Sequence, residues 1–91
     1  MKYEWDETKR KSNLIKHEID FEDTVSVFDD FTYTEIDDRF EYGEMRWITF
    51  GLLFGAIVAI SHTEDDRVIR IISARRAEKY EEEKYYKSVR D

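Results

Sequence analysis

A nearly uninterrupted apolar run from Ile48 to Ile60 constrains this chain more than any other feature of its sequence. A membrane-spanning helix needs about 20 such residues, so a shorter run is more typical of a buried core. The Phe54-Gly55 pair within the run predicts a turn between two strands. A further β-prone stretch follows the next group of charged residues. We therefore predict three strands, at residues 46–53, 56–63 and 67–74.

The N-terminal part of the chain predicts one short strand and two helices. Asp6 is a favourable N-cap, which predicts a strand at 3–6 followed by a helix at 7–17. Asp20 can cap a second, shorter helix, in which three apolar residues recur at helical spacing and form one buried stripe. These residues are Phe21, Val25 and Phe28.

The remaining segments complete an α+β fold. Residues 32–40 are β-prone but rich in acids, as in an edge strand that avoids further pairing. From Arg75 the pattern becomes helical and highly charged, and Tyr80 with Tyr85 or Tyr86 could dock this helix. We predict a single domain over residues 1–91, in the order β-α-α-β-β-β-β-α. Its core is an antiparallel sheet of about four strands, with two N-terminal helices and a C-terminal helix.

The composition excludes several classes of chemistry. The chain contains no cysteine, and it also contains no proline. A disulfide framework, a cysteine metal site and a thiol nucleophile are excluded. His17 and His62 lie in none of the spacings typical of metal sites, and no phosphate-binding glycine loop is present. We therefore expect neither a metal nor another cofactor. The N-terminus lacks the order of a secretory signal, so we expect a cytoplasmic protein without a membrane segment.

The charges are distributed unevenly along the chain. The formal net charge of -7 argues against a nucleic-acid partner, because phosphate binding depends on cations. However, residues 18–45 hold eleven acidic groups and one basic group, whereas both flanking segments are slightly positive. Four arginines fall in a ten-residue window without an acid, namely Arg67, Arg70, Arg75 and Arg76. The acidic segment predicts a solvated face or a surface for a basic partner, and the arginines predict a local phosphate site.

His62 and Arg70 are the side chains on this scaffold best suited to chemistry. Each also has a structural interpretation, as a hydrogen-bonded histidine and as an arginine whose stem packs while its head reaches solvent. A three-residue connection at 64–66 would place both on one face of the sheet, whereas a two-residue connection at 65–66 would place them on opposite faces. No glycine or asparagine favours a tight turn here, so we predict the shared face.

Six segments resemble the BrnT toxins of bacterial and archaeal type II toxin–antitoxin systems, in the same order and spacing. They read YEWDETK (3–9), NLIKHEIDFED (13–23), VFDD (27–30), GEMRWITFG (43–51), SHT (61–63) and IRIISARRA (69–77). The W-D-x-x-K start, the K-H-x-I-x-F-E step and the R-I-I-S-A-R segment are the most specific. Together the segments extend over nearly the whole chain.

The resemblance implies a RelE-like fold and a small ribonuclease that inhibits translation. It also implies a cognate, DNA-binding antitoxin of the ribbon-helix-helix type, which neutralises the toxin and with it binds its own operator DNA. The functional residues would lie at the positions that match the family. These are Lys16, His17, Arg46, His62, Arg70, Arg75 and Arg76.

Metal-free cleavage of RNA needs a base for the ribose 2′-hydroxyl, an acid for the leaving 5′-oxygen and cations for the phosphorane charge. His62 would be the acid or base, because its unperturbed pKa is about 6.5. Lys16 and His17, at the end of the first helix, are the alternative acid or base. The predicted RNA and phosphate ligands are Arg46, Arg70, Arg75 and Arg76.

The segment after His62 departs from the family pattern. Family members commonly carry an arginine and a glycine-containing turn after the His-Thr pair, whereas this chain has Glu64-Asp65-Asp66. The alternative function is therefore a catalytically degenerate toxin, which acts only as an antitoxin-binding and autoregulation module. An acidic mimic of nucleic acid would fit the charge but not the matched segments.

Overall fold

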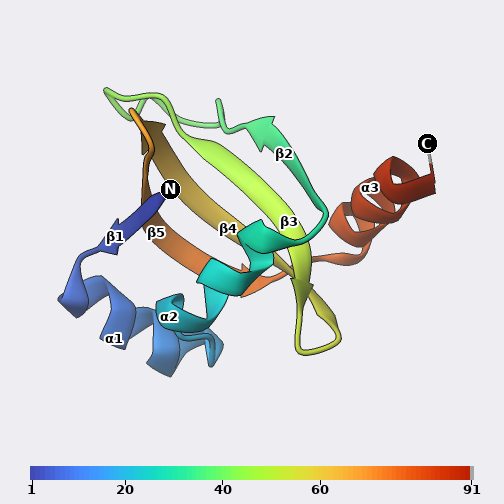
Figure 1. Ribbon diagram of the computed structural model, residues 1–91, viewed down its shortest axis with the longest axis horizontal. Coiled ribbons are helices and arrows are strands. Elements are labelled where there is room, and N and C mark those ends of the chain that lie inside the picture. The colour runs from blue at the N-terminus through green and yellow to red at the C-terminus, as the bar shows by residue number, and fades with distance from the viewer. Residues whose placement is uncertain (91) are drawn as a thin grey trace.

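The protein forms a five-stranded mixed sheet with three α-helices and one 3-10 helix in the computed structural model, which describes residues 1–90 (Figure 1). Its strands are β1 (Lys2–Trp5), β2 (Thr32–Ile36), β3 (Trp47–Leu53), β4 (Ala56–Asp65) and β5 (Val68–Arg76). They lie in the order β1-β5-β4-β3-β2. β2 to β5 pair antiparallel, and β1 runs parallel to β5. The predicted turn at Phe54-Gly55 joins β3 to β4 with positive φ angles of 50° and 82°.

The prediction of about four antiparallel strands is wrong, because β1 joins the sheet as a fifth and parallel strand. Tyr3 pairs with Ile69 and Trp5 with Ile71, so the two aromatic rings follow the alternation of β5. A parallel partner must be reached by a long crossover, which places it far away in the sequence. Four residues of local pattern contain no information about such a partner. The edge position predicted for β2 is confirmed.

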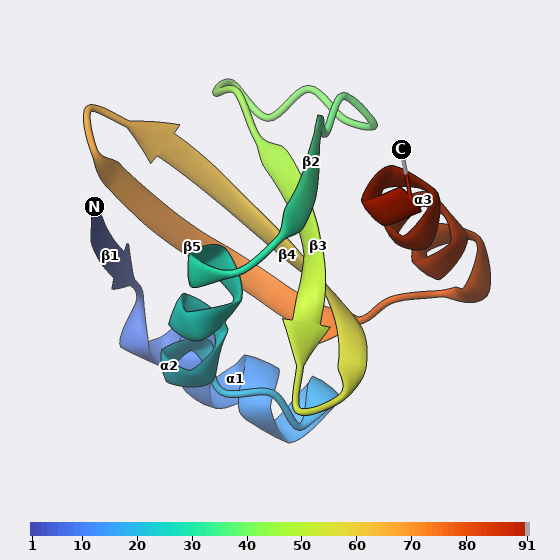
Figure 2. The same cartoon turned by 45° about the vertical axis from the view of Figure 1, so that its right-hand side comes forward.

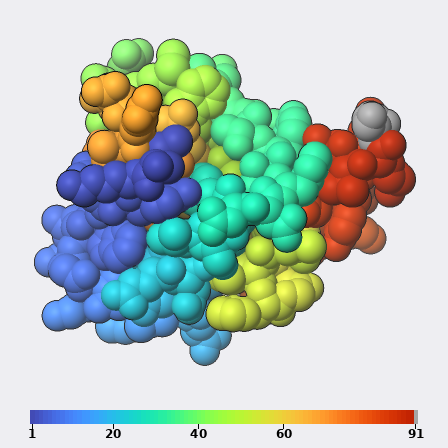
Figure 3. Space-filling view, viewed as in Figure 1, coloured from blue at the N-terminus to red at the C-terminus, as the bar shows by residue number. Residues whose placement is uncertain are grey.

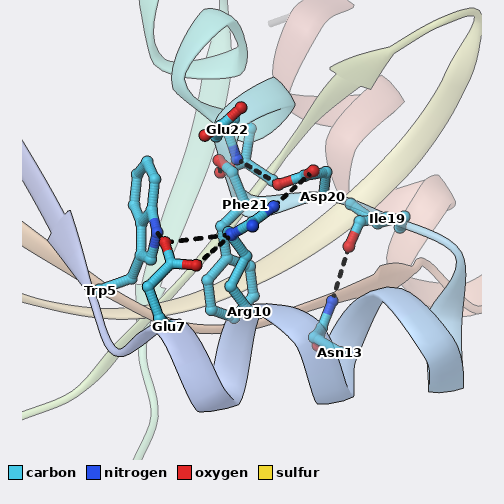
Figure 4. Close-up of polar contacts among 9 residues, drawn as sticks. Trp5, Glu7, Arg10, Asn13, Ile19, Asp20, Phe21 and Glu22 are labelled. Carbon is cyan, nitrogen blue, oxygen red and sulfur yellow. Dashed lines mark hydrogen bonds and ion pairs between the residues drawn. The ribbon is translucent and has the colours of Figure 1, made fainter.

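Helix α1 (Glu7–His17) has the predicted bounds and the predicted cap. The Lys9 backbone N–H donates to Asp6 Oδ1 at 3.0 Å, and Glu18 ends the helix with a φ of 59°. Arg10 then ties the helix to the next segment, since it donates to both Glu7 and Asp20 at 2.9 Å (Figure 4).

Asn13 fastens α1 to the free edge of β5 beyond the end of β1. Its side-chain N–H group donates to the Ala74 carbonyl at 2.8 Å, and its Oδ1 accepts from the Ala74 N–H at 3.1 Å. The same amide nitrogen also donates to the Ile19 carbonyl, as Figure 4 shows. One buried amide therefore satisfies the strand edge as a neighbouring strand would.

The second helical segment is α2 (Phe21–Thr24) followed by the 3-10 helix η1 (Val25–Asp29). The Asp20 cap is confirmed, since Asp20 Oδ1 accepts from the Glu22 N–H at 3.0 Å. The predicted stripe is confirmed as buried only at Phe21, since Val25 and Phe28 are both half-buried. The change to 3-10 winding turns Val27 into the core instead. Val27 packs so closely on β3 that a Cβ at Gly51 would lie 2.5 Å from Val27 Cγ1.

Helix α3 (Lys79–Arg90) begins later than predicted, because Arg75 and Arg76 still belong to β5. Tyr85 docks it in the core with 4% exposure, whereas Tyr80 and Tyr86 remain exposed. In Figures 1 and 2 this helix stands at the opposite end of the molecule from α1 and α2. None of the helices within residues 1–90 is long and apolar enough to cross a membrane.

The two faces of the sheet differ in what covers them. The α1 face packs against α1, α2 and η1, and its buried core is Ile19, Phe21, Val27, Leu53, Val58, Ile60, Ile69, Ile71 and Ala74. The α3 face has a smaller core next to α3, formed by Ile48, Phe50, Ile57, Ala59 and Tyr85. The remainder of the α3 face is polar, and it carries three of the seven predicted site residues, namely Arg46, Arg70 and Arg75.

Candidate functional site

The register of the β4–β5 hairpin separates His62 from Arg70, so the predicted shared face is wrong. The strands are joined by a two-residue turn at Asp66-Arg67, where both φ angles are positive, at 44° and 75°. His62 therefore pairs with Ile71 and Thr63 with Arg70. Neighbouring residues of a strand point to opposite faces. The hairpin thus adopts a tight primed turn without the glycine or asparagine that usually signals one.

His62 lies in the core of the α1 face, only 2% exposed. Its Nε2 is 2.7 Å from Thr49 Oγ1, and its ring packs edge-on against Phe28 with centroids 5.3 Å apart. Burial lowers the pKa of His62, because a charged ring would lose its hydration there. A ring enclosed in this way offers almost no surface to solvent, which favours a structural role for His62 over contact with RNA.

A bulge in β5 brings Arg70 and Arg75 onto the same face. Ser61 pairs with Ser73 and His62 with Ile71, so Ile72 is an extra residue opposite this step of β4. A separation of five residues would place two side chains on opposite faces of a regular strand, but one extra residue restores the same face. Arg70 and Arg75 therefore both lie on the α3 face.

Arg70 and Arg46 share one carboxylate on this face. Arg70 Nη2 donates to Glu44 Oε1 at 2.7 Å, and Arg46 Nε donates to Glu44 Oε2 at 3.0 Å. These two bonds hold the pKa of Glu44 below its usual range. The Arg46 guanidinium also lies 4.1 Å from the centre of the Tyr42 ring. These two of the predicted RNA ligands are therefore adjacent, and one carboxylate, close to Arg46 in the sequence but distant from Arg70, partly neutralises both.

Arg39 is a fourth arginine near this face that the sequence did not single out. It donates to both oxygens of Asp37, at 2.8 and 3.1 Å, and the Tyr42 hydroxyl also donates to Asp37. The Arg39 hydrogen bond is the largest cause that lowers the pKa of Asp37. Asp37 itself is buried, which no count of acids along the chain could reveal.

Arg75 is held by the first turn of α3. Its Nη1 and Nη2 donate to the two oxygens of Glu81, at 2.7 and 3.0 Å. Burial opposes the ionisation of Glu81, but the bonds from Arg75 and from the Glu78 N–H outweigh it and lower the pKa of Glu81. The bidentate pair fixes the guanidinium in one orientation.

Lys16 and His17 lie at the C-terminal end of α1, close to the end of β5. His17 is half-buried, and its pKa is lowered by burial and by the positive charges of Lys16 and Arg75. Arg76 points to the other face from Arg75 and shares a hollow with His17. These four predicted residues therefore gather at one end of the molecule.

The structure thus divides the predicted site into three parts. Arg46 and Arg70 lie with Glu44 at one end of the α3 face, His62 is buried in the core, and the remaining four residues surround the end of β5. Within residues 1–90, no group of three His, Asp or Glu side chains converges as metal ligands. The end of β5 combines an accessible imidazole with three cations, a set that can transfer protons and bind phosphate.

A protein-family model described as "Ribonuclease toxin, BrnT, of type II toxin-antitoxin system" matches residues 5–81. The chain belongs to the BrnT family. No curated protein matches it. The match includes α1, the whole sheet from Trp5 onward and the three parts of the site, and it ends at Glu81, within the first turn of α3. BrnT proteins are ribonuclease toxins of type II systems, so a protein antitoxin is the expected partner.

Proposed function

We propose that this chain is a metal-independent endoribonuclease toxin that cuts RNA at the end of β5. The observation that carries the proposal is the pair of hydrogen bonds between Asn13 and Ala74, which places the end of α1, with Lys16 and His17, beside the end of β5 in a chain that belongs to a ribonuclease toxin family. An imidazole can transfer a proton, and a guanidinium fork binds phosphate oxygens. The buried His62 leaves this role to His17, the other histidine of the chain.

Three residues of this cluster have a role in the proposed reaction. His17, whose pKa is lowered, is neutral at pH 7 and accepts the proton of the ribose 2′-hydroxyl. Arg75 binds the phosphate and stabilises the charge of the phosphorane. Lys16 donates a proton to the leaving 5′-oxygen. DNA is not cut, because it lacks the 2′-hydroxyl.

Arg70 and Arg46 would bind the RNA backbone away from the cut. Arg70 and Arg75 lie opposite Thr63 and Ala59, which are four residues of β4 apart, or roughly 13 Å at a rise of about 3.3 Å per residue. An RNA strand bound to both would lie along the α3 face. Binding of this kind weakens as salt rises, because it displaces counterions.

The proposal is tested by incubating the purified protein with single-stranded RNA and with DNA of the same sequence, in the presence of EDTA. We expect cleavage of RNA alone. His17→Ala and Lys16→Ala should remove most of it, whereas Lys11→Ala, an exposed lysine of the same helix, serves as the matched control. RNA that stays intact with the folded wild type would contradict the proposal.

One observation favours a second candidate, a degenerate toxin that only binds antitoxin. Glu44 and Glu81 already occupy the guanidinium groups of Arg46, Arg70 and Arg75, so RNA phosphate must compete with carboxylates that are part of the protein. Glu44→Gln removes one competing charge without changing the shape of the side chain. If the wild type and this variant both bind antitoxin and both leave RNA intact, the second candidate is correct.

The antitoxin surface that we propose is the loop between β2 and β3. Ile36, Phe40 and Met45 are exposed there and line one hollow together with Asp38 and Glu41. An exposed apolar patch rimmed by acids suits a basic partner that also buries apolar side chains. The buried ion pair of Asp37 keeps that carboxylate inside the protein, so the charges available to a partner are its neighbours.

Co-purification of the toxin with its antitoxin tests this surface. Asp38→Lys combined with Glu41→Lys should abolish the complex, and Glu82→Lys combined with Glu83→Lys on α3 is the control of equal charge change. An intact complex with the first double variant would place the antitoxin elsewhere.

The resemblance also supports finer features that we propose together. The antitoxin is of the ribbon-helix-helix type, its complex with the toxin binds operator DNA, and the toxin has a RelE-like architecture and stops translation in the cytoplasm. Pulse labelling of new protein after induction tests translation, and a DNA mobility shift with toxin, antitoxin or both tests the operator. Continued protein synthesis, or no shift with the complex, would contradict the respective feature.

A further inference from the structure

A hollow of about 200 Å³ opens beside the proposed cutting site. It lies between the end of α1, helix α2, the tip of the β3–β4 hairpin and the last residue of β5. In Figure 3 the hairpin tip, in yellow, lies next to the α2 segment, in cyan. The apolar wall of the hollow includes Ile19, Leu53 and Val58, and His17 is on the rim of the hollow. The hollow is therefore reached from the residue that we propose as the base.

The charged groups that line this hollow have no partners. Arg76, Glu18 and Asp23 all face it, and within residues 1–90 none of their charged groups forms an ion pair or a side-chain hydrogen bond. By contrast, the charged groups of Arg46, Arg70 and Arg75 are all paired. Because Arg76 forms no ion pair with Glu18 or Asp23, all three charged groups remain available to a ligand. A suitable ligand would bear a negative charge for the arginine and hydrogen-bond donors for the carboxylates.

Phe54 gives the hollow an aromatic rim in an unusual conformation. It is 85% exposed at the hairpin tip, with a φ of 50°. This left-handed conformation is unfavourable for a bulky residue, and asparagine or glycine is usual at such a turn. A residue that is both strained and solvent-exposed contributes little to folding. Its open ring face suits stacking against a planar ligand.

We propose that the hollow is a guanine-binding pocket, which selects the base next to the phosphate that is cut. The inference rests on the proposed function, because it takes RNA as the substrate. The ring of Phe54 stacks on the base, and Arg76 binds the adjoining phosphate. The carboxylates of Asp23 and Glu18 accept hydrogen bonds from the base edge. Guanine presents two neighbouring donors, N1–H and the N2 amino group, whereas adenine, cytosine and uracil each place an acceptor beside their donor.

Binding of the four ribonucleoside 3′-monophosphates, followed by NMR chemical shifts of the full-length protein, tests the pocket. We expect 3′-GMP to bind about tenfold more tightly than the other three, with shifts at Phe54 and Arg76. Asp23→Asn combined with Glu18→Gln should remove this preference, and Glu22→Gln, an exposed acid of α2 outside the hollow, should keep it. Phe54→Ala should weaken all four nucleotides about tenfold, as expected for the loss of a stacking contact. Phe40→Ala, a second exposed aromatic, is its control.

Equal binding of the four nucleotides, or a preference that survives the double substitution, would overturn the inference. So would shifts in the hollow that only antitoxin produces, since the occupant would then be a protein side chain. These outcomes are separate from the test of the proposed function. RNA cut without preference for guanine would overturn the pocket but not the nuclease. Selective binding of 3′-GMP by a protein that leaves RNA intact would overturn the nuclease but not the pocket.

Discussion

His62 and His17 have lowered pKa values in two very different regions of the molecule. His62 is enclosed between Thr49 and Phe28 in the core of the α1 face, and burial alone suffices to disfavour its charge. His17 is at the rim, where the charges of Lys16 and Arg75 add to partial burial. A lowered pKa can therefore mark a packed core as readily as a reaction site, and the surrounding groups tell the two apart.

The largest expected effect is the loss of RNA cleavage when His17 is replaced. His17→Ala should reduce RNA cleavage by about 100-fold or more, which is typical for the loss of a general acid or base. Its free energy of unfolding should change little, since the ring is only half-buried. Gel assays under single-turnover conditions measure the first quantity and urea unfolding the second. If the variant and the wild type cleaved RNA at comparable rates, His17 would have no role in the reaction.

The second prediction concerns the contribution of the buried His62 to the stability of the protein. His62→Ala should lower the free energy of unfolding by about 2–4 kcal/mol, because it opens a cavity and removes the partner of the buried Thr49 hydroxyl. His62→Gln retains a polar group near that hydroxyl and should lose less. Urea unfolding of both variants provides the measurement. A His62→Ala protein that is as stable as the wild type but inactive would reverse the assignment of the two histidines.

Asn13 allows the comparison to be sharpened, because this buried side chain ties the end of α1 to β5 and has no role in the proposed reaction. Asn13→Ala leaves the Ala74 N–H and C=O groups without partners, so we expect a loss of about 1–3 kcal/mol of stability. Cleavage should also fall, because α1 is no longer tied to β5 and His17 can move away from Arg75. Ser12→Ala, at the exposed neighbouring position, is the control. Loss of stability with unchanged cleavage would show that the rim needs no such anchor.

The smallest effect is a dependence of stability on pH. Burial holds the pKa of His62 below its unfolded value of about 6.5, so the unfolded chain binds a proton first as the pH falls. The stabilising contribution is complete above pH 6.5 and is lost as the pH falls from there toward the folded pKa. Between pH 7.5 and 5.5, wild type should therefore lose more stability than His62→Gln in urea titrations. The paired carboxylates respond at lower pH, near their usual pKa of about 4. Equal losses in both proteins would mean that His62 is not the responsible group.

Local signals in the sequence were sufficient where the structure depends on near neighbours. Asp6 and Asp20 act as caps within one turn, and the apolar run with its Phe54-Gly55 turn forms a hairpin through contacts that are close in the chain. The parallel place of β1 and the partners of the arginines depend on distant segments. The window from Arg67 to Arg76 contains no acid, yet Glu44 and Glu81 come from both sides in the sequence to pair with it.

The failure at His62 and Arg70 has a more specific cause. The face that a side chain occupies depends on how many residues separate it from the turn of the hairpin. That turn lies at Asp66-Arg67, which have positive φ angles although neither is the glycine or asparagine typical of such a turn. The bulge at Ile72 then shifted the count again for the residues beyond it, Arg75 and Arg76. Matched family segments give residue positions in such a case, but they do not say which face of the sheet each side chain occupies. For that reason the sequence named His17 and Arg75 without placing the end of α1 beside the end of β5.

The extra residue at Ile72 also determines which length change β5 can absorb. Removal of that single residue would leave a regular strand in which Ser73 still lies opposite Ser61, so every side chain after it would keep its face. Ala74 would stay in the core and Arg75 would stay beside Glu81. A deletion within β3, which pairs with β4 without a bulge, has no extra residue to remove and would turn the side chains beyond it to the other face. We therefore expect deletion of Ile72 to be far less damaging than deletion of a residue within β3.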